Sequence, residues 1–273
     1  MLALGIVTYN NKATQLERLV HSIELACKRL DQDHYVTRLY SIACGDQSEW
    51  AEIGIVHQCA APDGNLGFGR GMNRLMAKAF ADSQVSWFVC INPDGMLHRD
   101  LLAELLRCAE QYPDSIIEAR QFPEEHPKPY DPYSGLTLWA SAACMLIPRR
   151  VYEVIGGFDE NIFMYMEDVD LSWRARSAGF TVRVAPRALF AHSVLDRNPG
   201  PLIERSYYLS HRYLAYKWRR PTEQAFYERV LLEQGYLTAL PPLPLLDPAK
   251  TPTDTTPAVF EYGAAYAPLR WSP

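Results

Sequence analysis

The first half of the chain alternates short apolar runs with longer segments in which apolar residues recur every three or four positions. Short apolar runs predict buried strands, and the longer spacing predicts amphipathic helices. Strands are predicted at residues 2–9, 38–44, 54–59, 86–92 and 115–120, and helices at residues 14–30, from a glycine-rich stretch to about residue 81, and at 101–110. This alternation predicts an α/β fold with an open, mostly parallel sheet flanked by helices.

The second half of the chain predicts a different succession of elements. Strands are predicted at residues 138–147, 180–185 and 188–191, with a helix at 168–178 that ends before Gly179. Two more helices, at 203–220 and 222–237, precede a segment rich in proline and threonine. We therefore expect an α/β domain at residues 1–200, a helical C-terminal extension at 201–240 and a proline-rich tail at 241–273.

The composition narrows the class of protein. The chain has 273 residues, 48% of them apolar and 22% charged, which is typical of a globular protein in solution. Its net charge of -5 argues against a general nucleic-acid binder. The six cysteines are scattered without a CxxC pair, so we expect reduced thiols. With no charged segment before the first strand and no apolar run of about 18 residues, the expected location is the cytoplasm.

Polar residues follow several predicted strands at the point where each strand ends. Open parallel sheets bind ligands beyond the carboxyl ends of their strands. The residues at these ends are Thr8, Tyr9 and Asn10 after the first strand, Asp46 after the second, and Asn92 and Asp94 after the strand at 86–92. A carboxylate placed like Asp94 suits a divalent cation that binds diphosphate oxygens, although a simple Asx-Pro turn has the same sequence.

The stretch 65–73 has three glycines within five positions, which lets the backbone approach a ligand closely. The glycine spacing differs from that of a dinucleotide fingerprint. The alternative is a glycine-rich turn that only opens a helix. In the binding interpretation, Asn65 and Gly67 line the ligand, and Arg70 either contacts a diphosphate or points to solvent.

Acidic residues gather around the start of the helix predicted at 168–178. Asp168 is placed either to cap this helix through its amide protons or to act as an oriented, ionised base. Asp170 and Arg174 are four residues apart and are expected to pair on one helix face.

The run Gly156-Gly157-Phe158-Asp159-Glu160, then Phe163-Met164-Tyr165, Glu167-Asp168-Val169-Asp170-Leu171, Arg174-Ala175 and Ala178-Gly179, resembles the inverting glycosyltransferases of family two, most closely their rhamnosyltransferase-like branch. The resemblance covers most of residues 4–192. It implies a GT-A fold and transfer of a sugar, such as rhamnose or another deoxysugar, from a UDP- or dTDP-linked donor. The acceptor would be a hydroxyl of a glycan or of a lipid-linked intermediate in surface polysaccharide synthesis.

The same resemblance assigns roles to individual residues. Asp168 would be the general base, and Asp94 with His192 would hold Mg²⁺ or Mn²⁺. Donor contacts would come from Thr8, Tyr9, Asn10, Asp46, Asn65, Gly67, Arg70, Asn92 and Asp94, and the acceptor side from Trp139 and Glu167. The sequence departs from the family at residues 44–48, where an Asp-Asn-Gly-Ser type of motif is more common, and Arg70 occupies a position that is usually small. Trp139 is equally well explained as a packed core residue.

Three questions stay open at the level of sequence. The helix at 203–220 mixes basic and aromatic residues, which suits either peripheral contact with a membrane or packing of its aromatic side chains. A nucleotidyltransferase would share the early sheet, but it would be expected to carry a glycine-rich basic signature where this chain has Thr8-Tyr9-Asn10-Asn11. A non-catalytic module that binds sugar nucleotides or glycans is the third possibility.

Overall fold

A computed structural model describes residues 1–31, 35–45, 57–58, 64–126, 128–192 and 200–251. In this part of the chain one sheet has the strand order β3-β2-β1-β4-β7-β6-β8-β5. The strands are β1 (Leu2–Thr8), β2 (Thr37–Ala43), β3 (His57–Gln58), β4 (Trp87–Ile91), β5 (Gly95–Leu97), β6 (Ser115–Phe122), β7 (Cys144–Pro148) and β8 (Thr181–His192). The helices are α1 (Ala13–Asp31), α2 (Phe68–Phe80), α3 (Leu101–Gln111), α4 (Arg149–Ile155), α5 (Glu167–Ser177), α6 (Pro201–Lys217) and α7 (Pro221–Glu233), and a short 3₁₀ turn covers Pro248–Lys250.

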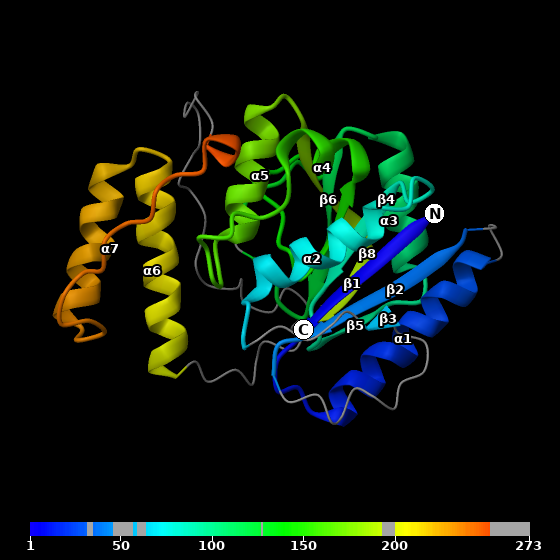
Figure 1. The fold of residues 1–273 in the computed structure, drawn as a ribbon. Helices are drawn as coiled ribbons and strands as arrows, with labels where there is room; N and C mark the ends of the chain where they lie inside the picture. Colours follow the sequence, from blue (N-terminus) through cyan, green and yellow to red (C-terminus); the bar gives the residue numbers. More distant parts are fainter. Residues whose placement is uncertain (32–34, 46–56, 59–63, 127, 193–199, 252–273) are drawn as a thin grey trace, which may run out of the picture.

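The central strands carry apolar side chains on both faces, as expected for a sheet covered on both sides. Leu2, Leu4 and Ile6 of β1 pack with residues of α1 and α3. Ala3 and Val7 of the same strand pack on the other face with α2, α4 and α5. The predicted α/β fold with a mixed, mostly parallel sheet is therefore confirmed (Figure 1).

The sheet curls upon itself. In a flat sheet β5 would lie four strand spacings, about 19 Å, from β4. The four steps from Ile91 to Gly95 span at most about 14 Å. The curl therefore brings the β4–β5 link next to the end of β8, where Gly95 pairs with His192.

Several predicted boundaries were wrong. The strand expected at 138–147 begins only at Cys144, because the amides of Ala140, Ser141 and Ala142 donate to side chains instead of to a neighbouring strand. The two strands expected at 180–185 and 188–191 form one strand, β8. Neither β5 nor α4 was predicted, and of the strand expected at 54–59 only residues 57 and 58 are described.

The helix α6 is anchored to α5 through buried charges. Lys217 donates to Asp159 at 2.7 Å and lies 2.8 Å from Asp170, and Asp170 also accepts from Arg174 at 2.8 Å. The Asp170–Arg174 pair was predicted and is confirmed. Burial alone raises the pKa of Asp170, but the charges of Lys217 and Arg174 together lower it. Figure 1 shows α6 and α7 beside the sheet on the side of α5.

Four of the ten basic and aromatic residues in the segment 203–220 are buried. Arg212, Tyr213, Lys217 and Trp218 are buried, and Arg212 donates to Glu228 of α7. Leu202 and Ile203, at the start of α6, are exposed. Among the described residues no helix is both long and apolar enough to cross a membrane.

Candidate active site

The predicted donor residues that follow β1 and β4 lie at one edge of the sheet, where these strands and β2 end. Ile6 pairs with Ile91, so that the residues after Thr8 and after Ile91 lie side by side. Asn10 adopts a left-handed conformation (φ 51°), and its side chain packs against Gly45, where an added Cβ would lie 2.3 Å from the Asn10 oxygen. Thr8 is buried and Tyr9 is exposed. Asp46 lies outside the described residues.

Asp94 and His192 come together at the same edge. The His192 Nε2 lies 3.2 Å from the Asp94 carboxylate and 3.4 Å from the Asn92 amide nitrogen, and the imidazole is only 3% exposed. Two ligands in adjacent positions around Mg²⁺, each at about 2.1 Å, would be about 3.0 Å apart. The separation of Asp94 and His192 therefore fits a divalent cation. In the described part of the chain no three His, Cys, Asp or Glu side chains group around one point.

Asp168 lies at the start of α5, but it does not cap this helix in the expected way. The capping position is Met166, without a side-chain hydrogen bond. The Asp168 carboxylate accepts from the amide of Ala142 at 3.1 Å and from that of Val169 at 2.8 Å. The backbone carbonyl of the next residue, Ala143, accepts from the backbone amide of Asn92 at 2.8 Å. One segment of backbone thus joins Asp168 to the cation side.

The two adjacent carboxyls Glu167 and Asp168 have different surroundings. Burial and then the charge of Asp168 raise the pKa of Glu167 to about 8. Among the described residues one Glu167 oxygen has no hydrogen-bond partner, and Glu167 is 6% exposed. Burial also raises the pKa of Asp168, while its two amide hydrogen bonds counteract this rise. Because amides stabilise the ionised form, we assign the shared proton to Glu167 and the negative charge to Asp168.

The backbone before α5 is strained. Tyr165 and Met166 both have left-handed conformations, with φ of 69° and 68°. Each such residue costs about 1–3 kcal/mol, and strain of this kind is concentrated at functional sites. The two residues set the angle at which Glu167 and Asp168 enter the helix.

The glycine-rich stretch packs closely on the acidic segment. Gly67 has φ 76°, and a Cβ there would lie 2.1 Å from the Phe163 carbonyl oxygen. Asn65 accepts from the Gly67 amide at 2.9 Å and so shapes this turn. Arg70 donates to the Glu160 carbonyl at 2.8 Å. The stretch thus has a structural reason for its sequence besides the predicted contacts with a donor.

Side chains from three other parts of the chain hold the backbone of residues 155–160. Arg174 donates to the carbonyls of Ile155 and Gly157 at 2.7 and 2.8 Å. Asn73 and Lys250 donate to the carbonyl of Phe158 at 3.0 and 2.6 Å. This role of Asn73 and Lys250 could not be predicted from the sequence, because hydrogen bonds between residues 85 and 92 positions apart leave no local pattern.

Trp139 is packed rather than exposed. It is 4% exposed, and the Lys128 ammonium lies 4.0 Å above its ring. Lys128 also donates to the Trp139 carbonyl at 2.8 Å and to Glu118. Trp139 is therefore a packed core residue, which is one of the two explanations predicted for it. Glu118 and Lys128 are further buried polar residues that the sequence did not single out.

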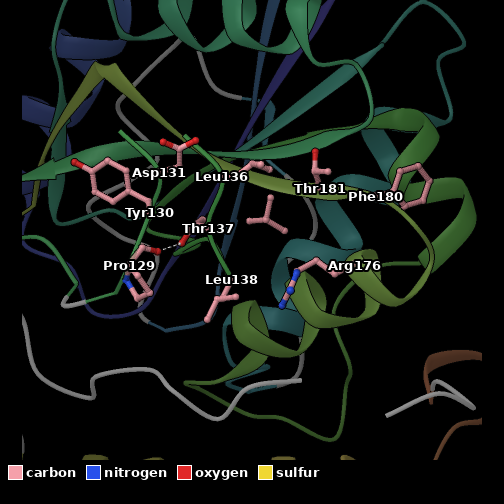
Figure 2. Close-up of a pocket in the computed structure, with 10 residues that line it drawn as sticks. Pro129, Tyr130, Asp131, Leu136, Thr137, Leu138, Arg176, Phe180 and Thr181 are labelled. Carbon is pink, nitrogen blue, oxygen red and sulfur yellow. Dashed lines mark hydrogen bonds between the residues drawn. The ribbon is translucent and has the colours of Figure 1, made fainter. Parts of the chain in front are cut away.

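A hollow of about 450 Å³ lies elsewhere, between the segment 129–138 and the end of α5. Figure 2 shows Arg176, Phe180 and Leu138 around it. Of the predicted site residues that the structure describes, none lines this hollow.

Comparisons with known proteins support the resemblance noted in the sequence. No family model matches the chain. The chain is 27% identical over 210 residues to an N-acetylglucosaminyl-diphospho-decaprenol L-rhamnosyltransferase of Mycobacterium tuberculosis, with 58% of this chain and 67% of that protein covered. It is 34% identical over 92 residues to the O-antigen biosynthesis protein RfbC of Myxococcus xanthus, with 33% of this chain but 7% of that protein covered.

Solved structures share the fold at low sequence identity. The structure of GalNAc-T7 with UDP, GalNAc and Mn²⁺ gives a TM-score of 0.62 at 12% identity, covering 86% of this chain and 52% of that one. The mannosyltransferase PcManGT from Pyrobaculum calidifontis, solved with GDP-Man and Mn²⁺, gives 0.57 at 15% identity, covering 87% and 76%. This chain thus spans about half the length of GalNAc-T7. It has the GT-A fold of nucleotide-sugar transferases, and its sequence is similar to the rhamnosyltransferase-like branch of glycosyltransferase family two.

Proposed function

We propose that the protein is an inverting glycosyltransferase that moves a sugar from a nucleoside diphosphate donor to a hydroxyl of a glycan or lipid-linked acceptor. The observation that carries this proposal is the placement of Asp168. Its half-buried carboxylate is held by two amides, and the segment 142–143 connects it to the edge where Asp94 and His192 meet. The similarity to a rhamnosyltransferase supports the same function.

In this reaction Asp168 is the general base. It takes the proton of the acceptor hydroxyl while the acceptor oxygen bonds to the anomeric carbon and the bond to the diphosphate breaks on the opposite side. The configuration at the anomeric carbon is therefore inverted. The raised pKa of Asp168 makes it a stronger base than an exposed aspartate. The amides of Ala142 and Val169 fix the direction of its oxygens.

Asp94 and His192 are the residues that would hold Mg²⁺ or Mn²⁺. When bound, the ion supplies positive charge for the departing diphosphate. Two structures with this fold, GalNAc-T7 and PcManGT, were solved with Mn²⁺, which supports a divalent ion in general. The side-chain amide nitrogen of Asn92 lies 3.4 Å from the His192 Nε2.

We infer that the donor is a UDP- or dTDP-linked sugar, with rhamnose or another deoxysugar as the group transferred. The acceptor that we favour is lipid-linked, because the mycobacterial relative is named for an N-acetylglucosaminyl-diphospho-decaprenol substrate. Thr8, Asn10, Asn65 and, outside the described residues, Asp46 are the proposed donor contacts. The exposed Leu202 and Ile203 are the side chains through which α6 would touch a membrane.

Donor binding can be tested by thermal unfolding of the protein with UDP, dTDP or GDP, each with Mn²⁺ and with EDTA. A ligand at 100 times its Kd stabilises the folded state by about 2.7 kcal/mol. We expect a rise in Tm with UDP or dTDP that EDTA abolishes. No rise with any diphosphate at saturating concentration would contradict a donor site.

Catalysis can be tested by comparing Asp168→Asn with the control Asp114→Asn, which changes an exposed aspartate. Transfer from dTDP-rhamnose to an N-acetylglucosaminyl-diphospho-polyprenol should fall by about 10²–10⁴-fold in Asp168→Asn and stay unchanged in the control. Donor binding by Asp168→Asn should persist. Unchanged transfer in Asp168→Asn would exclude Asp168 as the base, and binding of a sugar nucleotide without transfer in any variant would favour a binding module.

A further inference from the structure

A buried chain of polar side chains leads away from the proposed cation site. His192 Nδ1 lies 2.7 Å from the Gln121 amide oxygen, and the Gln121 amide nitrogen donates to Glu118 at 3.2 Å. Glu118 in turn accepts from Lys128 and from the Ser141 amide. All five residues are at most 7% exposed. Water therefore does not compete for these hydrogen bonds.

The hydrogen-bond partners of Gln121 determine which atom of its side-chain amide is the oxygen and which is the nitrogen. The Glu118 carboxylate, paired with Lys128, only accepts hydrogen bonds. The NH₂ group of Gln121 must therefore face Glu118, which leaves its oxygen toward His192. Because an amide oxygen also only accepts, the proton of the neutral imidazole lies on Nδ1. Nε2 then keeps its lone pair on the side of Asp94 and Asn92.

The contact between Glu118 and Gln121 lies at an irregularity in the sheet. Glu118 and Gln121 are three residues apart, and in a regular strand such residues point to opposite faces. The register between β6 and β8 shifts between Ala119 and Arg120, whose partners are Ala185 and Leu189.

Asp94 competes with Gln121 for the imidazole proton. The Asp94 oxygen lies 3.2 Å from Nε2 and would accept a proton placed there. A proton on Nε2 would occupy the lone pair that a cation needs. We propose that Gln121 is a positioning residue that holds His192 in the Nδ1–H tautomer and so keeps Nε2 available for a divalent cation. This inference rests on the cation site of the proposed function.

The tautomer can be observed directly by ¹⁵N NMR of the histidine side chains in the full-length, metal-free protein at pH 8. The His192 signals are identified by their loss in His192→Gln. We expect the Nδ1–H pattern in the unsubstituted protein and in the control Gln111→Leu, which changes an exposed glutamine. Gln121→Leu should move the proton to Nε2, toward Asp94. An Nε2–H tautomer in the unsubstituted protein, or no change in Gln121→Leu, would overturn the inference.

The consequence for the cation is tested by titration of Mn²⁺ in the presence of UDP, followed by calorimetry. Loss of a residue that orients a ligand typically weakens metal affinity by about 10–100-fold, and we expect this in Gln121→Leu. Gln121→Glu keeps an acceptor beside Nδ1 and should bind Mn²⁺ more tightly than Gln121→Leu. Equal affinity of Gln121→Leu and the unsubstituted protein would overturn the inference alone. If the unsubstituted protein binds no Mn²⁺, the proposed cation site is contradicted, and so is the role of Gln121 in that site.

Discussion

Substitution of Lys217 by methionine tests how the structure balances its buried charges. The Lys217 side chain is 0% exposed and contacts Asp159 at 2.7 Å and Asp170 at 2.8 Å, carboxylates that are 2% and 0% exposed. With Arg174 the group holds two positive and two negative charges. Lys217→Met would leave one uncompensated negative charge inside the protein.

The expected loss of stability follows from this geometry. Breaking a buried pair by removing one partner costs about 3–5 kcal/mol. The carboxylates keep other donors, since Tyr213 donates to Asp159 at 2.8 Å and Trp218 to Asp170 at 3.0 Å. These donors are neutral and do not replace the lost positive charge, so we still expect a loss of about 3–5 kcal/mol in the free energy of unfolding. At about 2–4 °C per kcal/mol, Tm would fall by about 6–20 °C.

Urea unfolding followed by circular dichroism measures this loss. Lys78→Met, at an exposed position of α2, is the matched control and should stay within about 0.5 kcal/mol of the unsubstituted protein. The double variant Asp159→Asn/Lys217→Met restores the charge balance, so it should be more stable than Lys217→Met alone. The reasoning is refuted if Lys217→Met loses less than about 1 kcal/mol, or if the double variant is less stable than the single one.

Three further predictions concern other features. The pKa of Glu167 is raised to about 8, so at intermediate pH the folded chain keeps a proton that the unfolded chain has released. The free energy of unfolding should therefore fall as pH rises from about 4.3 to 8. Glu167→Gln should flatten this part of a plot of Tm against pH. Burial lowers the pKa of His211 to about 4, so stability should fall as pH decreases from about 6.5 to 4, and His211→Gln should remove that decline. Gly67→Ala should cost about 1–3 kcal/mol more than Gly64→Ala in chemical unfolding, because both glycines have positive φ but only the first would meet a backbone oxygen, that of Phe163; equal losses would contradict this reason.

Local patterns predicted the sheet and most helices well. Runs such as Trp87–Ile91 are apolar throughout, and a strand covered on both faces needs this composition. The pair Asp170–Arg174 could be predicted because residues four apart share a helix face. The small residues at 140–143 were misleading, since a propensity for strands does not reveal that backbone amides will bond to side chains.

The site was less accessible to sequence reasoning. Asp94 and His192 were brought together by the family resemblance, and only the curl of the sheet explains why they meet. Gln121 and Lys217 have no local pattern, because His192, Asp159 and Asp170 lie 47 or more positions away from them. Nothing in the sequence distinguishes such buried polar residues from those on the surface.

Residues 186–188 of β8 have no partner in the described pairing with β6, and this limits how the sequences of related proteins can differ in this segment. Gly95 pairs with His192, and successive residues of a strand point to opposite faces. Loss or gain of one residue between Ala185 and His192 would place a different side chain beside Asp94 and turn the histidine away. Exchange of one residue for another within this segment leaves that spacing intact. The length of the segment should therefore vary less among relatives than its composition, and an alignment with a gap there would indicate a site that is built from other residues.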